Sequence, residues 1–389
     1  MYFAISQFNI HLLVEENKLY VLALSMIKGL GPVSVKSLIA YCGGPKAVFE
    51  LPRGKLMRAP GIGEKAAQWV RDAETLHRAE AELQRCEKAG VSVVSYLDQD
   101  YPHLLKYIHD APLALFKKGG VNLNAQPNIA IVGTRKPTEY GKEVAERFAT
   151  FFAAQGINVV SGLAYGIDIA AHRSALQVNG ITTGVLGHGI DMIYPSTHWR
   201  KAQEMLSRGG LLTEYPIGTQ PEAVHFPARN RIVAGLSRAV IVVEAAETGG
   251  ALITARMAFD QNREVYAIPG RLDDPRSQGC NYLIRDQIAR LVASPEEVLA
   301  DLEIRWKQAG EVEKEAETPA LPPDALPEGV ALSPDEAKVM NFLARGEAIV
   351  DQITVHTGIH ISRLNSLLLS MEFKGLLRQA PGKKYKRIS

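Results

Sequence analysis

The chain has 389 residues, of which 46% are hydrophobic and 22% are charged. This composition is typical of globular proteins and excludes collagen-like and wholly disordered chains, and at roughly 150 residues per domain the length suggests about two or three domains. The 44 Lys and Arg residues against 42 Asp and Glu residues leave a formal charge of +2. Any basic binding surface must therefore be local.

Three cysteines, Cys42, Cys86 and Cys280, are scattered through the chain without a CxxC spacing. They predict neither a zinc site nor a disulfide framework, and they fit a reducing compartment. The N-terminal segment MYFAISQFNIHLLVEENKLY lacks the basic start and long apolar core of a signal peptide. No run approaches about 18 uncharged apolar residues, so we expect no membrane span and a cytoplasmic location.

Composition divides the chain into four expected regions. Residues 1–90 contain short helical stretches broken by glycine pairs, and residues 91–305 alternate β-rich runs with amphipathic stretches. Residues 306–332 are rich in Glu, Pro and Ala, which predicts an extended acidic linker. Residues 333–389 form a last domain that ends in the basic tail KKYKR.

The two glycine turns of the first region, Gly29-Leu30-Gly31 and Gly61-Ile62-Gly63, each precede a helical stretch. This pattern is similar to a helix-hairpin-helix, whose loop amides can hold a DNA phosphate without reading sequence. The alternative is that the hairpins only pack against the main domain.

The second region has the pattern of a doubly wound α/β domain. Its apolar runs are rich in Val and Ile and show little polar alternation, as expected for strands covered on both faces. Amphipathic segments such as GKEVAERFATFFAAQG lie between them. We expect right-handed βαβ units and a parallel sheet, whose ligands bind at the carboxyl ends of the strands. The predicted strands are 129–133, 157–161, 181–187, 239–244 and 264–269.

The first of these strands ends in Gly133-Thr134-Arg135-Lys136. A dinucleotide-binding enzyme would carry G-x-G-x-x-G here, so the sequence predicts no such cofactor. Thr134 and the amides that follow it can donate to a phosphate, and Arg135 can bind one in a bidentate manner. The alternative is a tight turn with solvated cations.

The second strand ends in a glycine-rich loop, in which Ser161, Gly162 and Gly166 allow close approach of a ligand to the backbone. Asp168 is placed to cap or anchor the next helix. His172 follows four residues later, so we expect a hydrogen bond between these two side chains and structural roles for both.

The segment Phe226-Pro227-Ala228-Arg229-Asn230-Arg231 opens a later helix, because proline suits a first turn. The helix dipole disfavours cations there, so we expect a bound anion or a carboxylate of the protein to neutralise the two arginines. Side chains two apart cannot face the same way. We therefore expect Arg229 to meet the ligand and Arg231 to pair internally, with two structural salt bridges as the alternative.

The fourth strand ends at Glu244, whose carboxylate can take a ribose hydroxyl or neutralise one of the two arginines. Gly249 and Gly250 then open another helix, and glycines at such a start form an anion-binding nest. The strand ends carry no Ser/His/Asp set, no cluster of metal ligands and no paired carboxylates at helical spacing. The sequence therefore supports binding better than catalysis, and we expect neither a metal nor another cofactor.

In this order, the motifs resemble the DprA/Smf family of DNA-processing proteins over about residues 20–300. The matching segments include IAIVGTR, SGLAYGID, FPARNRIVAGLS, GGALITA and YAIPG. The resemblance implies an extended Rossmann-like domain that binds single-stranded DNA without a catalytic reaction. It also implies a homodimer that helps to load the RecA recombinase during natural transformation. The DNA-binding residues expected on this basis are Gly133, Thr134, Arg135, Lys136, Ser161, Gly162, Tyr165, Gly166, Phe226, Arg229, Asn230, Arg231, Gly249 and Gly250.

Some positions depart from the pattern of the family. Tyr165 stands where Arg is frequent, which removes a phosphate contact and offers an aromatic face for a base. Gly249 and Ala251 replace serines, and Ile288 falls where glycine is usual.

The last region resembles a winged helix. A Ser-Pro signal starts its first helix, a second helix follows from Asp351, and a turn at Gly358 precedes a third helix over 361–373 and a hairpin with a turn at Pro381-Gly382. Residues 331–389 hold 9 Lys and Arg against 5 Asp and Glu. We expect either DNA contact through the third helix or, because leucines place much of that helix in the core, a protein contact.

The sequence hypothesis is a non-catalytic single-stranded DNA-binding protein that protects incoming DNA and mediates recombination. One alternative is a nucleotide phosphoribohydrolase similar to the lysine-decarboxylase-like Rossmann family, which carries P-G-G-x-G-T-x-x-E. In this chain Thr254 falls at the position of that catalytic glutamate. Another alternative is a sequence-specific regulator that binds duplex DNA through its last domain.

Overall fold

The computed structural model describes residues 16–59, 61–304 and, with short gaps, 333–387. The chain divides into two compact units, Met1–Gln308 and Ala309–Ser389. The expected linker over 306–332 lies outside the described residues, and the expected division at residue 90 stays a prediction.

The described part of the first unit contains a nine-stranded sheet in the order β1-β2-β6-β5-β4-β3-β7-β8-β9. The strands from β6 to β9 pair in parallel, while β2 pairs antiparallel with both β1 and β6. This confirms a mostly parallel, doubly wound sheet. The strands are β1 Ser92–Ser95, β2 Ala114–Lys118, β3 Asn128–Val132, β4 Asn158–Ser161, β5 Thr182–Val185, β6 Gly210–Thr213, β7 Ala239–Val242, β8 Glu264–Ala267 and β9 Arg290–Leu291.

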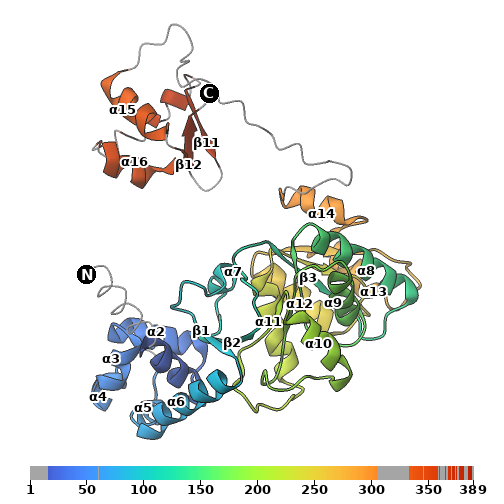
Figure 1. Ribbon diagram of the computed structural model, residues 1–389, viewed down its shortest axis with the longest axis horizontal. Coiled ribbons are helices and arrows are strands. Elements are labelled where there is room, and N and C mark those ends of the chain that lie inside the picture. Colours follow the sequence, from blue (N-terminus) through green and yellow to red (C-terminus); the bar gives the residue numbers. More distant parts are fainter. Residues whose placement is uncertain are drawn as a thin grey trace. The chain divides into compact units, whose positions relative to one another are not determined.

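Helices cover both faces of this sheet (Figure 1). Alternate residues of β3 and β7 point to opposite faces, so each of these strands contributes to two cores. One core lies under α8 (Glu139–Ala154) and α9 (Ile167–Gln177), and the other lies under α11 (His225–Leu236) and α12 (Gly250–Asp260). The remaining helices of this part are α7 His103–Lys106, the 3-10 helix η1 Ser196–His198, α10 Trp199–Met205, α13 Gln278–Arg285 and α14 Pro295–Asp301.

The region before β1 is helical and has its own core around the first glycine turns. Leu30 and Ile62, the central residues of these turns, are both buried in this core. The last helix of the region, α6, also packs on β1 and β2, so the helical region and the sheet share a core. The helices are residues 16–25, α2 Pro32–Cys42, α3 Pro45–Glu50, α4 Arg53–Leu56, α5 Glu64–Val70 and α6 Ala73–Lys88.

The second unit is a winged helix. Its first helix, α15 (Pro334–Leu343), begins at a capping box in which Ser333 and Glu336 exchange hydrogen bonds, as the Ser-Pro signal predicts. Leu364, Leu368 and Met371 of the predicted third helix are buried in its core, whereas Gly358 and Pro381-Gly382 lie outside the described residues. The other elements are β10 Ala348–Ile349, α16 Val350–Thr357, β11 Leu377–Ala380 and β12 Lys384–Arg387, and the strands pair in the order β10-β12-β11.

None of the helices that the structure describes combines the length and the apolar character needed to cross a bilayer.

Candidate functional site

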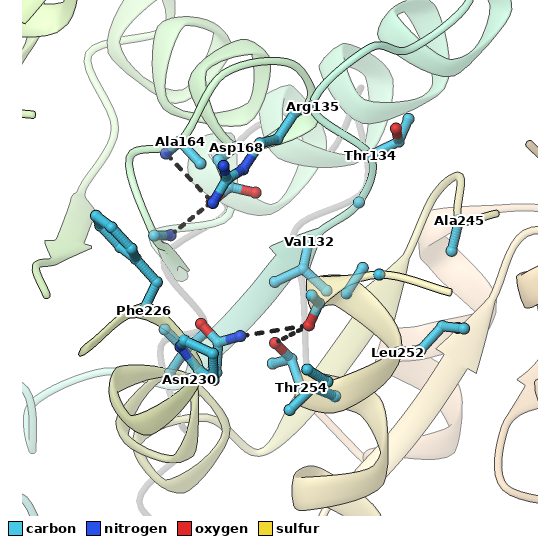
Figure 2. A pocket seen from close by; sticks show the side chains of 18 of the residues that line it. Val132, Thr134, Arg135, Ala164, Asp168, Phe226, Asn230, Ala245, Leu252 and Thr254 are labelled. Carbon is cyan, nitrogen blue, oxygen red and sulfur yellow. Dashed lines mark hydrogen bonds between the residues drawn. The ribbon is translucent and has the colours of Figure 1, made fainter. Parts of the chain in front are cut away.

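A large cavity lies at the switch point of the nine-stranded sheet. The connection after β3 runs to β4 on one side of it, and the connection after β7 runs to β8 on the other side. The loops after β3, β4 and β7, with the first turns of α11, enclose a cavity of about 860 Å³ (Figure 2). Open α/β sheets bind their ligands at this kind of place.

Segments that are far apart in the sequence meet around this cavity. Figure 2 shows Arg135 and Asp168 on one side, Asn230 and Thr254 on the other, and Val132 at the end of β3 between them. The residues predicted from sequence that line the cavity are Gly133, Thr134, Arg135, Gly162, Asp168, Phe226, Arg229, Asn230, Gly249 and Gly250.

Arg135 is exposed at the mouth of the cavity. Its guanidinium lies 5.9 Å from the ring centroid of Phe226, and that ring lies 5.7 Å from the ring of Tyr194. The mouth therefore combines an accessible cation with two adjacent aromatic rings.

Arg229 lies in the wall of the cavity, and only 5% of its surface is exposed. Its Nη1 donates to the carbonyl oxygens of Gly162, at 2.8 Å, and of Val185. Burial lowers the pKa of Arg229 to about 10, against the opposing charge of Asp168. A Cβ at position 162 would collide with this guanidinium, which explains the glycine there. The arginine expected to meet the ligand is thus also part of the frame of the site.

Arg231 pairs inside the protein, as predicted for one member of the arginine pair. Its Nη1 and Nη2 each donate to Glu214 at 2.6 Å, and its Nε donates to Asp110 at 2.9 Å. Glu214 outweighs the effect of burial, so the pKa of Arg231 is raised. Arg231 does not line the cavity.

The predicted hydrogen bond between Asp168 and His172 is wrong. Asp168 accepts from the backbone N–H groups of Gly162, at 3.0 Å, and Ala164, at 3.3 Å. Burial raises the pKa of Asp168, although Arg229 and these amides oppose the shift. Its carboxylate therefore anchors the loop after β4 and caps no helix.

His172 lies one turn further along α9, above β5. Its Nδ1 lies 2.6 Å from Oγ1 of Thr182, whose hydroxyl donates to the carbonyl oxygen of Val159. The hydroxyl proton is thus already engaged, so the imidazole must donate from Nδ1. Nε2 is buried without a partner among the described residues. The structural role predicted for His172 is retained, with a different partner.

Glu244 neither neutralises an arginine nor faces the ligand site. Both the N–H and the hydroxyl of Thr138 donate to its carboxylate, the N–H at 2.9 Å. Thr138 is the N-cap of α8 and also accepts from the N–H of Gly141. Because β7 is the neighbour of β3, the side chain at its end meets the loop that leads into α8.

The backbone of Thr134 is also occupied, so the expectation that its amide donates to a phosphate is wrong. Its N–H donates to the carbonyl oxygen of Glu244 at 2.7 Å, and its carbonyl oxygen accepts from Ile167 at 3.2 Å. The helix itself begins only at Glu139. The loop thus presents the Arg135 side chain to the cavity and uses the Thr134 amide internally.

Four further predicted residues do not line the cavity. Ser161 is fully buried and donates to the carbonyl oxygen of Ile131. Gly166 has a φ of +79°, and a Cβ there would collide with the Thr134 carbonyl oxygen, so its glycine serves the contact between two loops. Lys136 is exposed beside the cavity, and the half-exposed ring of Tyr165 lies edge-on to His198. DNA contacts by these residues stay predictions.

The start of α12 forms one side of the cavity, as the glycine pair predicts. Gly249 is its N-cap and makes no side-chain cap, so the first amides of the helix have no such acceptor. The carbonyl oxygen of Gly250 accepts from Nδ2 of Asn230 at 3.3 Å and from Oγ1 of Thr254 at 3.0 Å (Figure 2). Asn230 thereby fixes α11 against α12.

Sequence reasoning missed several lining residues. Arg256 is exposed on α12, and its spacing of three from Ile253 and seven from Gly249 could have placed it on the same helix face. Tyr194 and Ala223 come from loops without a motif, and Glu247 adds a carboxylate. Among residues 16–59, 61–304 and the described part of the second unit, no three His, Cys, Asp or Glu residues gather where they could hold a metal ion.

Comparison with known proteins places these motifs in a family. A model described as DNA recombination-mediator protein A matches residues 92–303. The chain belongs to this family. A second model, described as the DprA winged helix domain, matches residues 317–383 of this chain.

Several known proteins match more than half of this chain. Protein Smf of Synechocystis is 33% identical over 398 residues, which cover 96% of this chain and 100% of that protein. The crystal structure of DNA processing protein A from Streptococcus pneumoniae matches with a TM-score of 0.63 and 36% identity, covering 75% of this chain and 97% of that one. DNA processing protein A from Helicobacter pylori, solved for its single-stranded DNA binding mode, matches with a TM-score of 0.51 and 30% identity, covering 56% and 97%.

Proposed function

We propose that this chain binds single-stranded DNA at the switch-point cavity and acts as a non-catalytic recombination mediator. The observation that carries the proposal is the open cavity itself, which brings together three arginines, a glycine-led helix start and two aromatic rings. The single-stranded DNA binding of the Helicobacter pylori relative supports the choice of ligand.

The polar groups of the cavity suit a phosphate backbone. Arg135 and Arg256 are exposed and line the cavity. The first residues of α12 also line it, so the amides at the start of this helix add a partial positive charge. Asp168 is engaged by backbone amides, so Glu247 is the lining carboxylate that remains exposed. Contacts of this kind hold a strand without reading its sequence.

The aromatic rings at the mouth favour unpaired bases. Phe226 and Tyr194 lie in contact at an interplanar angle of 33° beside Arg135. A base can stack on such a ring only when it is not enclosed in a duplex. We therefore expect single strands to bind more tightly than duplex DNA of the same length.

The surroundings of Thr254 favour binding over the phosphoribohydrolase alternative. Its hydroxyl donates to the carbonyl oxygen of Gly250 within α12, at the place where that enzyme family carries its glutamate. A hydroxyl held in this way supplies no acid–base group for glycosidic cleavage. Release of free base from nucleoside monophosphates at enzymatic rates would restore the alternative.

We extend the proposal to the biological role. The chain acts in the cytoplasm as a homodimer, protects incoming DNA, and loads RecA onto it during natural transformation. Membership of the DNA recombination-mediator protein A family supports this role. The winged helix adds a DNA or protein contact to it.

A competition experiment tests the binding proposal. Labelled single-stranded DNA is bound to the full chain and displaced with unlabelled single strand or duplex at two salt concentrations, while light scattering gives the mass of the protein. We expect displacement by single strand at much lower concentration than by duplex, and a dimeric mass. Equal displacement by duplex would contradict the proposal. Faster RecA filament formation on DNA coated with single-strand-binding protein would support the loading role.

A further inference from the structure

A ring of hydrogen bonds ties α6 of the helical region to the loop before α11. Oε1 of Glu82 accepts from the N–H of Ile217 at 2.6 Å, and Oε2 accepts from Nη1 of Arg85 at 3.0 Å. Nη2 of Arg85 closes the ring by donating to the carbonyl oxygen of Ile217 at 3.1 Å. Both backbone groups of one loop residue are thus held by two side chains of a distant helix.

Burial distinguishes this ring from an ordinary surface ion pair. Glu82 is only 3% exposed, whereas 53% of the Arg85 side chain is exposed. An exposed pair three residues apart on a helix contributes little, but a buried carboxylate that loses its donors is strongly unfavourable. Cys86 and Ala79 of the shared core lie on the same face of α6. The position of Ile217 is therefore tightly specified.

The anchored loop leads directly into the wall of the cavity. The N–H of Gly218 donates to Asp191 at 2.9 Å, and the carbonyl oxygen of Thr219 accepts from Gly189 at 2.9 Å. Ala223 then lines the cavity, and α11 begins two residues later with Phe226 in its first turn. A shift of the loop at residues 217–219 would move this aromatic ring relative to Arg135.

We propose that Glu82 and Arg85 are positioning residues for the ligand site, which fix loop 214–224 and through it the cavity wall without touching the ligand. The helical region thereby influences how tightly the cavity binds single-stranded DNA, although none of its described residues lines the cavity. This inference rests on the proposed function, because binding of single-stranded DNA is its readout.

Two variants break the ring from opposite sides. Glu82→Ala removes the acceptor for the Ile217 N–H, and Arg85→Met removes the donor to its carbonyl oxygen while keeping an apolar stem. We expect both variants to show faster amide hydrogen exchange in loop 214–224 and about tenfold weaker binding of a labelled oligothymidylate, as the loss of charged hydrogen bonds implies. The salt dependence of binding should not change, because no phosphate contact is lost.

Two further variants are controls. Glu82→Gln keeps an acceptor for the Ile217 N–H and should recover most of the affinity. Glu80→Ala removes an exposed carboxylate from the same helix and should bind as the wild type does. If Glu82→Ala fails to fold, Arg85→Met decides the question, because Arg85 is largely exposed.

The outcomes separate this inference from the proposed function. A wild-type chain that does not bind single strands overturns the proposed function and the inference with it. A wild-type chain that binds, with Glu82→Ala and Arg85→Met equal to it in affinity, overturns the inference alone. A weaker salt dependence in either variant would also overturn it, since the side chain would then contact the phosphates directly.

Discussion

Arg135 and Arg229 both line the cavity, but their surroundings differ. Arg135 is exposed and lies over the ring of Phe226, whereas Arg229 is buried and held by the carbonyl oxygens of Gly162 and Val185. The sequence indicated a cationic site, yet it could not separate these roles. The carbonyl groups that engage Arg229 come from the ends of two other strands, and no motif in the arginine segment specifies them.

Replacement of the two arginines should therefore affect stability differently. Arg229→Met leaves the buried Asp168 without its nearby positive charge and two carbonyl groups without their donor, so we expect a loss of about 3 kcal/mol in unfolding free energy. Arg135→Ala should stay within about 0.5 kcal/mol of the wild type. Urea unfolding measures both, and an Arg229→Met chain as stable as the wild type would contradict this assignment.

His172 makes the stability of the fold depend on pH. Burial, with smaller contributions from His198 and Arg229, lowers its pKa to about 3, whereas the unfolded chain has an ordinary histidine pKa of about 6.5. Between these values the unfolded chain binds a proton that the folded chain excludes, so stability falls as pH falls.

The variant His172→Asn keeps a donor for Thr182 but does not titrate. Between about pH 6.5 and pH 5 we expect it to lose less unfolding free energy than the wild type, and the difference should reach up to about 1.4 kcal/mol per pH unit. Urea unfolding across this range is the measurement, with the exposed His103→Asn as the control variant. Identical pH slopes for the His172→Asn chain and the wild type would show that His172 does not carry this dependence.

At the scale of elements, the strands were predictable where they are central. Continuous Val and Ile runs mark β3 and β7 because helices cover both of their faces. The strands β1, β2, β6 and β9, which flank the five predicted ones, were missed. Of these, β1 has four residues with serine at both ends, and β9 has only two residues. The place of the cavity followed from the strand alternation, because a doubly wound sheet has a switch point by its topology.

The start of α8 shows an N-cap residue, Thr138, that is held in place by Glu244 at the end of another strand. Thr138→Val should lower the unfolding free energy by about 1 kcal/mol, because α8 loses its N-cap and Glu244 loses a donor. Thr138→Ser keeps the hydroxyl and should remain close to the wild type. Urea unfolding of the two variants provides the comparison, and equal stability of the valine and serine chains would rule out the cap.

At the scale of the whole molecule, the site is assembled from pieces that no single motif contains. Loop 214–224 reaches the cavity through contacts with α6 and with the loop after β5, and that second loop carries Tyr194. Sequence patterns gave no signal for either loop. The motifs after β3, β4 and β7 were predictable because each follows a strand, and the arginine pair was predictable because it opens a helix. Their arrangement around one cavity depends on the strand order, which the structure provides.

The most direct test of the central claim is the salt dependence of single-strand binding in Arg135→Ala, measured by fluorescence anisotropy. About four phosphate contacts predict a log–log slope near −3, and the loss of one contact should reduce its magnitude by about 0.7. Arg208→Ala, at the opposite edge of the sheet before β6, is the matched control and should keep the wild-type slope. An Arg135→Ala chain with wild-type affinity and slope would contradict the account.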